Sequence, residues 1–193
     1  MDVQKERNKT NLVIEGEQSL PNQTWSKVKK KLDSFICDSL KGRLQFRVTS
    51  YRWTHDEQGR ACITVDKKEV FNMCTLTSNN ALFEKEEALR SQQNIDYDVY
   101  NGPQNCNIQD QAHEMVMSEG VFAQYDFFNI VEEYFNLPIE KALVSENILI
   151  RILSIIDRRV GKRTLKKMRE SVKQEKDIVQ YFYHLRCEAE ELV

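Results

Sequence analysis

Apolar positions follow two different periods along the chain, and the first is helical. Apolar side chains recur every three or four residues from Trp25 to Leu40, with lysines between them on the opposite side. Gly42 follows, where a helix often ends. The spacing predicts an amphipathic helix over 25–40. Its apolar positions are Trp25, Val28, Leu32, Phe35, Ile36 and Leu40.

The period then changes to two. "RLQFRVTSYRW" (43–53), "RACITV" (60–65) and "EVFNMCTL" (69–76) each alternate between apolar and polar residues, which is typical of half-buried strands. The first segment changes phase after Val48, so we expect a bulge near Thr49 and Ser50. Short turn-rich connections join the three segments. The sequence therefore predicts a three-stranded antiparallel meander, packed on one face by the preceding helix.

The second half of the chain has a helical period only. Residues 79–111 are rich in turn-forming residues around Gly102-Pro103, which indicates a joint, with room for one helix. From 112 onward apolar residues return at helical spacing, and the 148–160 segment is apolar on more than one side, as in the centre of a bundle. We expect an α+β fold: a mobile leader (1–20), a helix–meander subdomain (21–78), a joint (79–111) and a helical bundle (112–193).

Composition narrows the classes of function. The chain has 193 residues, 40% of them hydrophobic, and a net charge of −2. We therefore expect a hydrophobic core, and we expect no overall electrostatic attraction to nucleic acid or membrane. No apolar run approaches the ~20 residues that span a bilayer. The five cysteines are scattered, without Cys-x-x-Cys spacing. We expect a cytoplasmic protein with reduced thiols, no metal and no cofactor; Cys62 and Cys74 could face each other on neighbouring strands.

Recognisable catalytic patterns are missing from the sequence. The three histidines are His55, His113 and His184, and none stands beside a Gly-x-Ser-x-Gly elbow. His113-Glu114 lacks a second histidine at helical spacing. "GKRT" (161–164) has Ile156 where a phosphate-binding loop needs its first glycine. We therefore predict that the chain is not an enzyme; an enzyme would need a pocket at the joint, near His113 and Glu114.

A dense basic run, "RRVGKRTLKKMR" (158–169), places seven cations in twelve residues with no acid among them. These cations could neutralise phosphates, or they could form a solvated face that complements a helix end. Together with the flank of the last helix they make a candidate binding surface. Its members are Arg158, Lys162, Arg163, Lys166, Lys167, Arg169, Tyr181, Tyr183 and His184.

Two charged residues, Asp157 beside this run and Arg159 within it, occupy positions that are locally unfavourable for their charge. Asp157 lies near the end of a predicted helix, where the helix dipole disfavours a carboxylate. Arg159 falls on the stripe that points towards the packed side of the central helix. Such residues usually have specific partners. We expect a partly buried structural cluster in which Asp157 pairs with Arg186, and Arg159 pairs with Glu188.

The meander offers a third candidate surface. Basic residues decorate its polar face and turns, and two aromatic residues lie among them, as in sheets that stack bases. No consensus of an RNA-binding sheet is present, and charges on an outer face also prevent edge pairing. The residues concerned are Arg43, Arg47, Arg52, Arg60, Lys67, Lys68, Tyr51 and Trp53.

Five blocks taken together carry a family resemblance. They are "CDSLKGR" (37–43), "GRACITVDKKEVFNMCTL" (59–76), "AQYDFF" (123–128), "SENILIRILSIIDRRVGKRTL" (145–165) and "VQYFYHLRCEAE" (179–190). The chain resembles a group of small bacterial cytoplasmic proteins of unassigned function, over residues 25 to 190. The resemblance implies a bacterial cytosolic α+β protein and brings no catalytic residues. It places in characteristic motif positions Asp157, Arg158, Arg159, Gly161, Lys162, Arg163 and Arg186.

The expected function follows from these observations. We interpret the chain as a non-enzymatic protein-binding or regulatory module, immunity-like or antitoxin-like, whose partner is another protein. Tyrosine and arginine on the candidate surface are residue types that concentrate binding energy. The alternative is weak, sequence-independent nucleic-acid binding through 158–169, which salt would weaken steeply.

Overall fold

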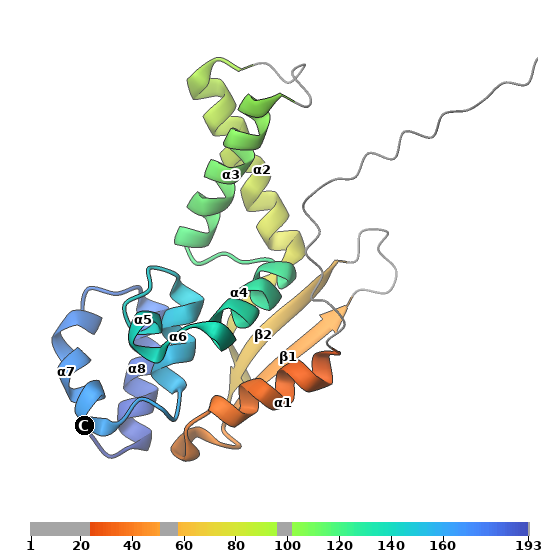
Figure 1. Cartoon of the computed structure of the whole chain (residues 1–193). Coiled ribbons are helices and arrows are strands. Elements are labelled where there is room, and N and C mark those ends of the chain that lie inside the picture. Colours follow the sequence, from red (N-terminus) through yellow and green to blue (C-terminus); the bar gives the residue numbers. More distant parts are fainter. Residues whose placement is uncertain (1–23, 51–57, 96–101, 193) are drawn as a thin grey trace, which may run out of the picture.

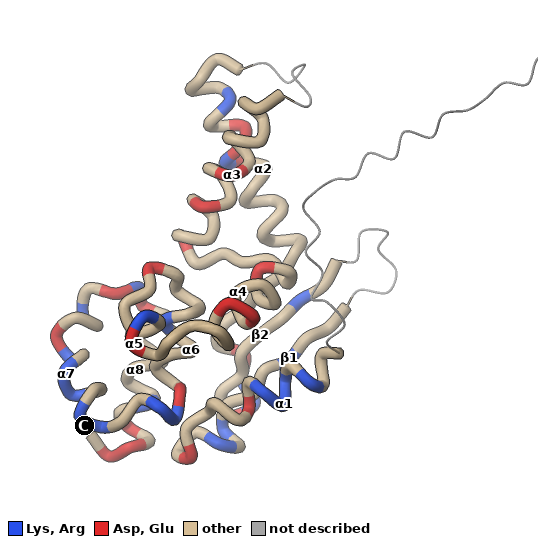
Figure 2. The backbone as a smooth tube through the Cα atoms, viewed as in Figure 1, with Lys and Arg blue, Asp and Glu red and all other residues tan. Residues whose placement is uncertain are grey.

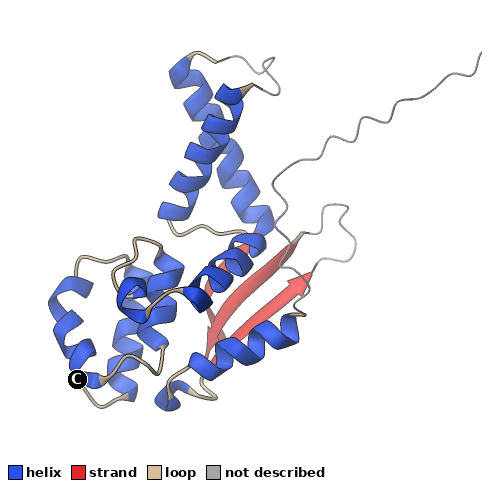
Figure 3. Ribbon diagram, in the orientation of Figure 1, coloured by secondary structure: helices blue, strands red, loops and turns tan. Residues whose placement is uncertain are grey.

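The computed structural model describes residues 24–50, 58–95 and 102–192. An N-terminal helix lies along a three-stranded antiparallel sheet, and the C-terminal half is helical, so the α+β class is confirmed (Figures 1 and 3). Buried side chains from the helix, the sheet and the C-terminal helices form one core cluster. The segments 21–78 and 112–193 therefore share a core. The expected leader lies outside the described residues.

The first helix, α1 (Trp25–Phe35), buries Val28 and Leu32 and leaves its lysines outside, as predicted. It is shorter than expected, because the chain turns extended at Ile36 and forms a separate 3-10 turn, η1 (Asp38–Leu40). Gly42 follows with a φ of +82°, a conformation that glycine adopts without strain. The early end of α1 has a specific cause in the functional site, described below.

The meander consists of β1 (Leu44–Ser50), β2 (Gly59–Val65) and β3 (Lys68–Cys74), in that order across the sheet. Asp66 and Lys67 both have positive φ, as a two-residue hairpin turn requires. The expected bulge near Thr49 and Ser50 is wrong, since these residues pair in regular register with Arg60 and Gly59. The register shifts instead at Ile63/Thr64, opposite β3. Tyr51 and Trp53 lie outside the described residues.

The expected joint at 79–111 is largely helical. The helices α2 (Thr75–Gln93) and α3 (Pro103–Ser118) pack against each other and project from the body (Figure 1). Asn94, in the left-handed conformation, ends α2, and Gly102-Pro103 begins α3. A small separate core holds this hairpin together, formed by Leu89, Ile108 and Ala112. The one helix for which the sequence left room is α2, and the loop expected from Gly102-Pro103 to residue 111 is corrected, because α3 begins there.

The remaining helices are α4 (Gln124–Asn136), α5 (Ile139–Ala142), α6 (Ile148–Ile156), α7 (Lys162–Val172) and α8 (Asp177–Ala189). All nine residues of α6 are buried, which confirms its central position. It contacts α4 on one side and α8 on another, while α4 also contacts the sheet and α7 contacts α8. Asn147 caps α6 by accepting hydrogen bonds from Leu149 N and Ile150 N.

Candidate functional site

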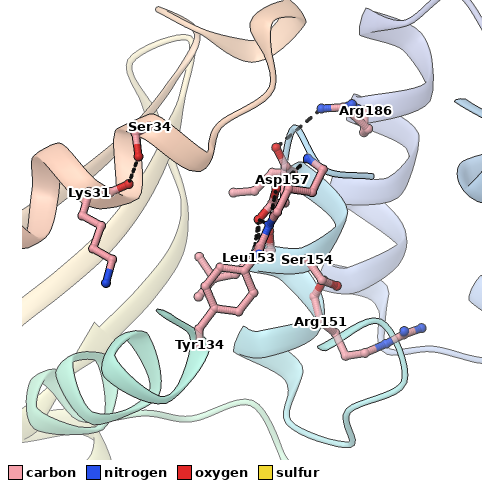
Figure 4. Close-up of polar contacts among 10 residues, drawn as sticks. Lys31, Ser34, Tyr134, Arg151, Leu153, Ser154, Asp157 and Arg186 are labelled. Carbon is pink, nitrogen blue, oxygen red and sulfur yellow. Dashed lines mark hydrogen bonds and ion pairs between the residues drawn. The ribbon is translucent and has the colours of Figure 1, made fainter. Parts of the chain in front are cut away.

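Asp157 occupies the turn between α6 and α7 and is fully buried. Its carboxylate accepts hydrogen bonds from the hydroxyl of Tyr134, on α4, and from Arg159. The Arg159 backbone N lies 2.7 Å from Oδ1, and its Nη2 lies 2.7 Å from Oδ2. A buried carboxylate is tolerated only when its oxygens are satisfied in this way. Figure 4 shows the ring of Tyr134 pointing towards Asp157.

The backbone of the same turn is joined to the end of α1. Ile36 and Asp157 form an isolated antiparallel bridge. Cys37 N donates to Ile156 O at 2.9 Å, and Arg158 N donates to Phe35 O at 2.7 Å. The extended backbone at Ile36 makes this pairing possible and explains why α1 ends at Phe35. The turn and its contacts with α1 and α4 form what we call the Asp157 corner.

Aromatic rings extend the Asp157 corner across α1 and α4. The guanidinium of Arg159 lies 4.5 Å from the centre of the Phe35 ring. Phe35 stacks on Phe135 with ring centres 5.8 Å apart, and Lys31 Nζ lies 4.0 Å above Phe135. Cations over aromatic faces contribute about 0.5–1 kcal/mol each at exposed sites. Burial, reinforced by the bond to Asp157, raises the pKa of Tyr134, while Asp157 raises the pKa of Arg159.

A second carboxylate, Glu190, joins three further elements beside this corner. It accepts a hydrogen bond from Ser39 Oγ of η1 at 2.9 Å and pairs with Arg186 of α8 at 3.1 Å. Lys162 Nζ, at the start of α7, donates to the Glu190 backbone oxygen at 2.8 Å. Arg186 is buried and also donates to Val160 O at 3.1 Å. Burial lowers the pKa of Arg186.

The cluster residues predicted from sequence are thus brought together with different partners. Asp157 pairs with Arg159 rather than Arg186, and Arg186 pairs with Glu190 rather than Glu188. Glu188 itself is exposed. Each expected pairing is corrected for a local reason. Arg159 follows Asp157 closely enough to turn back on it, and the chain bends after α8 so that Glu190 faces inward.

The basic run forms the outer face of α7. Leu165, Met168 and Val172 are buried towards α8, and five of the seven exposed positions of α7 carry cations, the other two being Glu170 and Ser171. Figure 2 shows basic residues along α7 and a second group along α1. Lys162 is held by Glu190, and Glu170 pairs with Lys173 at 2.7 Å. The exposed cations of the predicted surface are Arg158, Lys162, Arg163, Lys166, Lys167 and Arg169, and we call them the basic face.

The ring-bearing residues of the candidate surface, Tyr181, Tyr183 and His184, differ in their exposure to solvent. Tyr181 is 40% exposed and His184 is exposed. Tyr183 is buried, and its hydroxyl donates to Leu165 O at 2.8 Å, which fastens α8 to α7. Burial raises the pKa of Tyr183 to about 12. Tyr183 therefore serves packing and is removed from the candidate binding surface.

The first turn of α4 holds polar residues that the sequence did not single out. Gln124 Nε2 donates to Thr49 O and to Arg60 O, both at 3.1 Å, and ties α4 to two strands. His113 Nε2 lies 2.9 Å from Asp126 Oδ1 and ties α3 to α4. The hydrogen bond to Asp126 raises the pKa of His113. His113 is thus placed beside Asp126, a partner that the sequence analysis did not name.

Two of the five described cations of the meander pair with carboxylates. Arg43 pairs with Asp66 at 2.8 Å, and Arg60 pairs with Glu69. Arg52 lies outside the described residues. None of the five cysteines forms a disulfide, and Cys62 lies opposite Asn72, not Cys74. Within residues 24–50, 58–95 and 102–192, no group of three or more His, Cys, Asp or Glu side chains is placed to hold a metal ion. Nor is any helix there long and apolar enough to cross a membrane.

Fold and corner together define an α+β protein in which a buried polar corner fixes a helix with an exposed basic face. The model of the SF0329 protein family matches residues 24–187, which include the helix, the meander, the hairpin and most of the bundle. The chain belongs to this family. No curated protein and no solved structure matches the chain.

Proposed function

We propose that the chain is a non-enzymatic regulatory module that binds an acidic surface of another protein through the basic face of α7. The observation that carries this proposal is the concentration of exposed cations on one helix face whose opposite side is packed on α8. Such a face gains electrostatic complementarity, and hence specificity and a high association rate, with an acidic partner. Binding would need little rearrangement, because the Asp157 corner and Glu190 already fix the beginning of α7.

The surroundings of the basic face favour a protein over a nucleic acid. Glu188 and Glu191 are exposed at the end of α8, beside Glu190 and its contact with Lys162. A polyphosphate that continued past Lys162 would meet these carboxylates, whereas an acidic protein surface of limited area would not. The exposed positions of α7 itself include no aromatic side chain on which bases could stack. Weak nucleic-acid binding is the second candidate, since the same cations neutralise phosphates.

The setting we propose is the bacterial cytosol, on the strength of the family resemblance, with an immunity-like or antitoxin-like role. In such a role the chain would occupy an acidic surface of its partner and hold the partner inactive. The five cysteines, none of which forms a disulfide, suit this setting.

The test is affinity capture of the partner by the purified chain, with charge reversal on the basic face. Lys166→Glu/Lys167→Glu should abolish capture of a stoichiometric acidic protein, because each reversal turns attraction into repulsion. The matched control is Lys27→Glu/Lys30→Glu, which makes the same charge change on exposed lysines of α1 and should leave capture intact. Equal loss in both variants would contradict a role for α7.

A second measurement separates the two candidate partners. Fluorescence anisotropy of a labelled single-stranded oligonucleotide and of a labelled duplex is recorded at about 50 and 200 mM salt, a range over which phosphate binding weakens steeply. The proposal expects weak binding that Lys166→Glu/Lys167→Glu scarcely changes. Tight oligonucleotide binding that this variant abolishes would favour the nucleic-acid function instead.

A further inference from the structure

The α2–α3 hairpin has a solvent-facing side that its own small core does not use. On α2, Leu89 is buried and Leu82 is half-buried, both in the small core shared with α3. Residues 76, 80, 83 and 87 form a separate stripe, since positions four, seven and eleven apart share a helix face. Leu76 is 46% exposed and Phe83 is 56% exposed. The helix is therefore apolar on two sides, of which one is covered.

Exposed apolar side chains gather on this part of the molecule. Single exposed hydrophobics are normal on a protein surface, but grouped ones mark sites of interaction. Of the six large hydrophobics that are exposed among the described residues, four lie on the hairpin or on the first turn of α4. These four are Leu76, Phe83, Met115 and Tyr125.

The charges around Phe83 are acidic. Glu84 and Glu87 are exposed next to it, and within the described residues neither has a cation partner. The two cations of the hairpin are already engaged: Lys85 pairs with Glu119 at 2.6 Å, and Arg90 lies 3.9 Å from Glu86. A ligand that covers Phe83 would therefore bring its own cations to meet the two free carboxylates.

We propose that the exposed stripe of α2 is a second docking surface, which binds a basic amphipathic helix of another protein. The stripe from Leu76 to Glu87 is about 16 Å long at 1.5 Å per residue, the length of three helical turns. Apolar side chains of such a helix would cover Leu76 and Phe83, and flanking lysines or arginines would pair with Glu84 and Glu87. This is recognition of an amphipathic helix through regularly spaced anchors.

A second copy of this chain does not supply what the stripe lacks. Its own α2 would bring the same carboxylates, and the two cations of that helix, Lys85 and Arg90, are already engaged by Glu119 and Glu86. Its α1 and α7 both carry exposed cations, but the exposed positions of these two helices include no large apolar side chain that could cover Phe83. Only a partner with both features satisfies the charge and the apolar surface together. This surface is independent of the basic face, so the two proposals stand or fall separately.

The test uses a labelled synthetic helix of leucines and lysines, about four turns long to match the stripe, in fluorescence anisotropy with the full chain. Phe83→Ser should weaken binding about tenfold, because it removes the central anchor. Glu84→Gln/Glu87→Gln should weaken binding and reduce its salt dependence, since the lost contacts are ionic. Phe83 is exposed, so both variants should retain the wild-type thermal midpoint; if Phe83→Ser does not fold, the glutamine variant decides.

Two matched controls make the test specific. Val144→Ser changes the most exposed large hydrophobic, at 77%, and Glu132→Gln/Glu133→Gln removes an exposed acidic pair from α4. Both should leave binding unchanged. Equal weakening in the controls, or no binding by the wild type, would overturn the proposal. So would a dimer in sedimentation equilibrium that Phe83→Ser dissociates, because the stripe would then serve a second copy.

Discussion

Replacement of Asp157 by alanine removes the buried carboxylate on which the corner depends. Breaking a buried ion pair typically costs about 3–5 kcal/mol. The value here should fall at the low end, because Arg159 is 35% exposed and can turn to water, and because Tyr134 keeps its hydrogen bond to Leu153 O at 3.2 Å. We expect the free energy of unfolding to fall by about 3 kcal/mol. The thermal midpoint should fall by about 6–12 °C for a chain of this size.

The assay is urea denaturation at pH 7, followed by circular dichroism and tryptophan fluorescence together. Asp38→Ala is the matched control: Asp38 pairs with Lys41 on the surface, where its side chain is 89% exposed, so its loss should not change stability measurably. A Tyr134→Phe variant, alone and combined with Asp157→Ala, measures the coupling between the two groups. A loss below about 0.5 kcal/mol for Asp157→Ala, the size of an ordinary surface change, would refute the structural role of the corner.

Three further predictions concern contacts that join separate elements. The pKa of His113 is raised in the folded state, so its pairing with Asp126 stabilises the fold below the unfolded pKa of about 6.5 and ceases to do so as the pH rises through the folded value. The difference in unfolding free energy between wild type and His113→Gln should therefore be larger at pH 5.5 than at pH 8.5. An equal difference at the two pH values would contradict this pairing. In Gly59→Ala the new methyl carbon would lie 2.1 Å from Gln124 Oε1; displacing this side chain from its two carbonyls should cost about 1–3 kcal/mol in urea denaturation, and an unchanged free energy of unfolding would contradict this close contact. Glu190→Gln should lower the free energy of unfolding by about 2 kcal/mol, because Arg186 loses its carboxylate partner. A free energy of unfolding equal to that of the wild type in the same assay would show that Arg186 needs no such partner.

Local periodicity was sufficient to predict the elements that bury one continuous face. The buried pair Val28 and Leu32 lies on the predicted face of α1, and the alternation in the meander placed its three strands. The helical period failed at Ile36, which fits the helical pattern yet is extended. Its conformation depends on the bridge to Asp157, more than a hundred residues away, and no local pattern contains that information.

The second helix of the hairpin, α3, was missed because the hairpin has so little core. This helix begins "PQNCNIQDQ" (103–111), a sequence typical of a loop. A signal was nevertheless present: Ile108, Ala112 and Val116 recur every four residues, and all three are buried. A stripe of three small or medium apolar residues is weak evidence in a sequence, yet it suffices for a helix that packs against one neighbour.

The residues of the Asp157 corner could be located in the sequence, but their pairing partners could not. A carboxylate at a helix end and an arginine on a packed stripe correctly drew attention to Asp157 and Arg159. Their partners depend on which elements meet, and Tyr134 comes from a different helix altogether. The choice between Glu188 and Glu190 depended on where α8 ends, and helix ends are the least certain part of any prediction from sequence.

The central claim is that the Asp157 corner joins the helix–meander half and the bundle into one cooperative unit that presents the basic face. Native-state hydrogen exchange tests it most directly, at the two amides that cross the corner, Cys37 N and Arg158 N. The account predicts that both exchange only with global unfolding in the wild type and exchange much earlier in Asp157→Ala. Rapid exchange of these amides in the wild type, while the α6 amides stay protected, would contradict it.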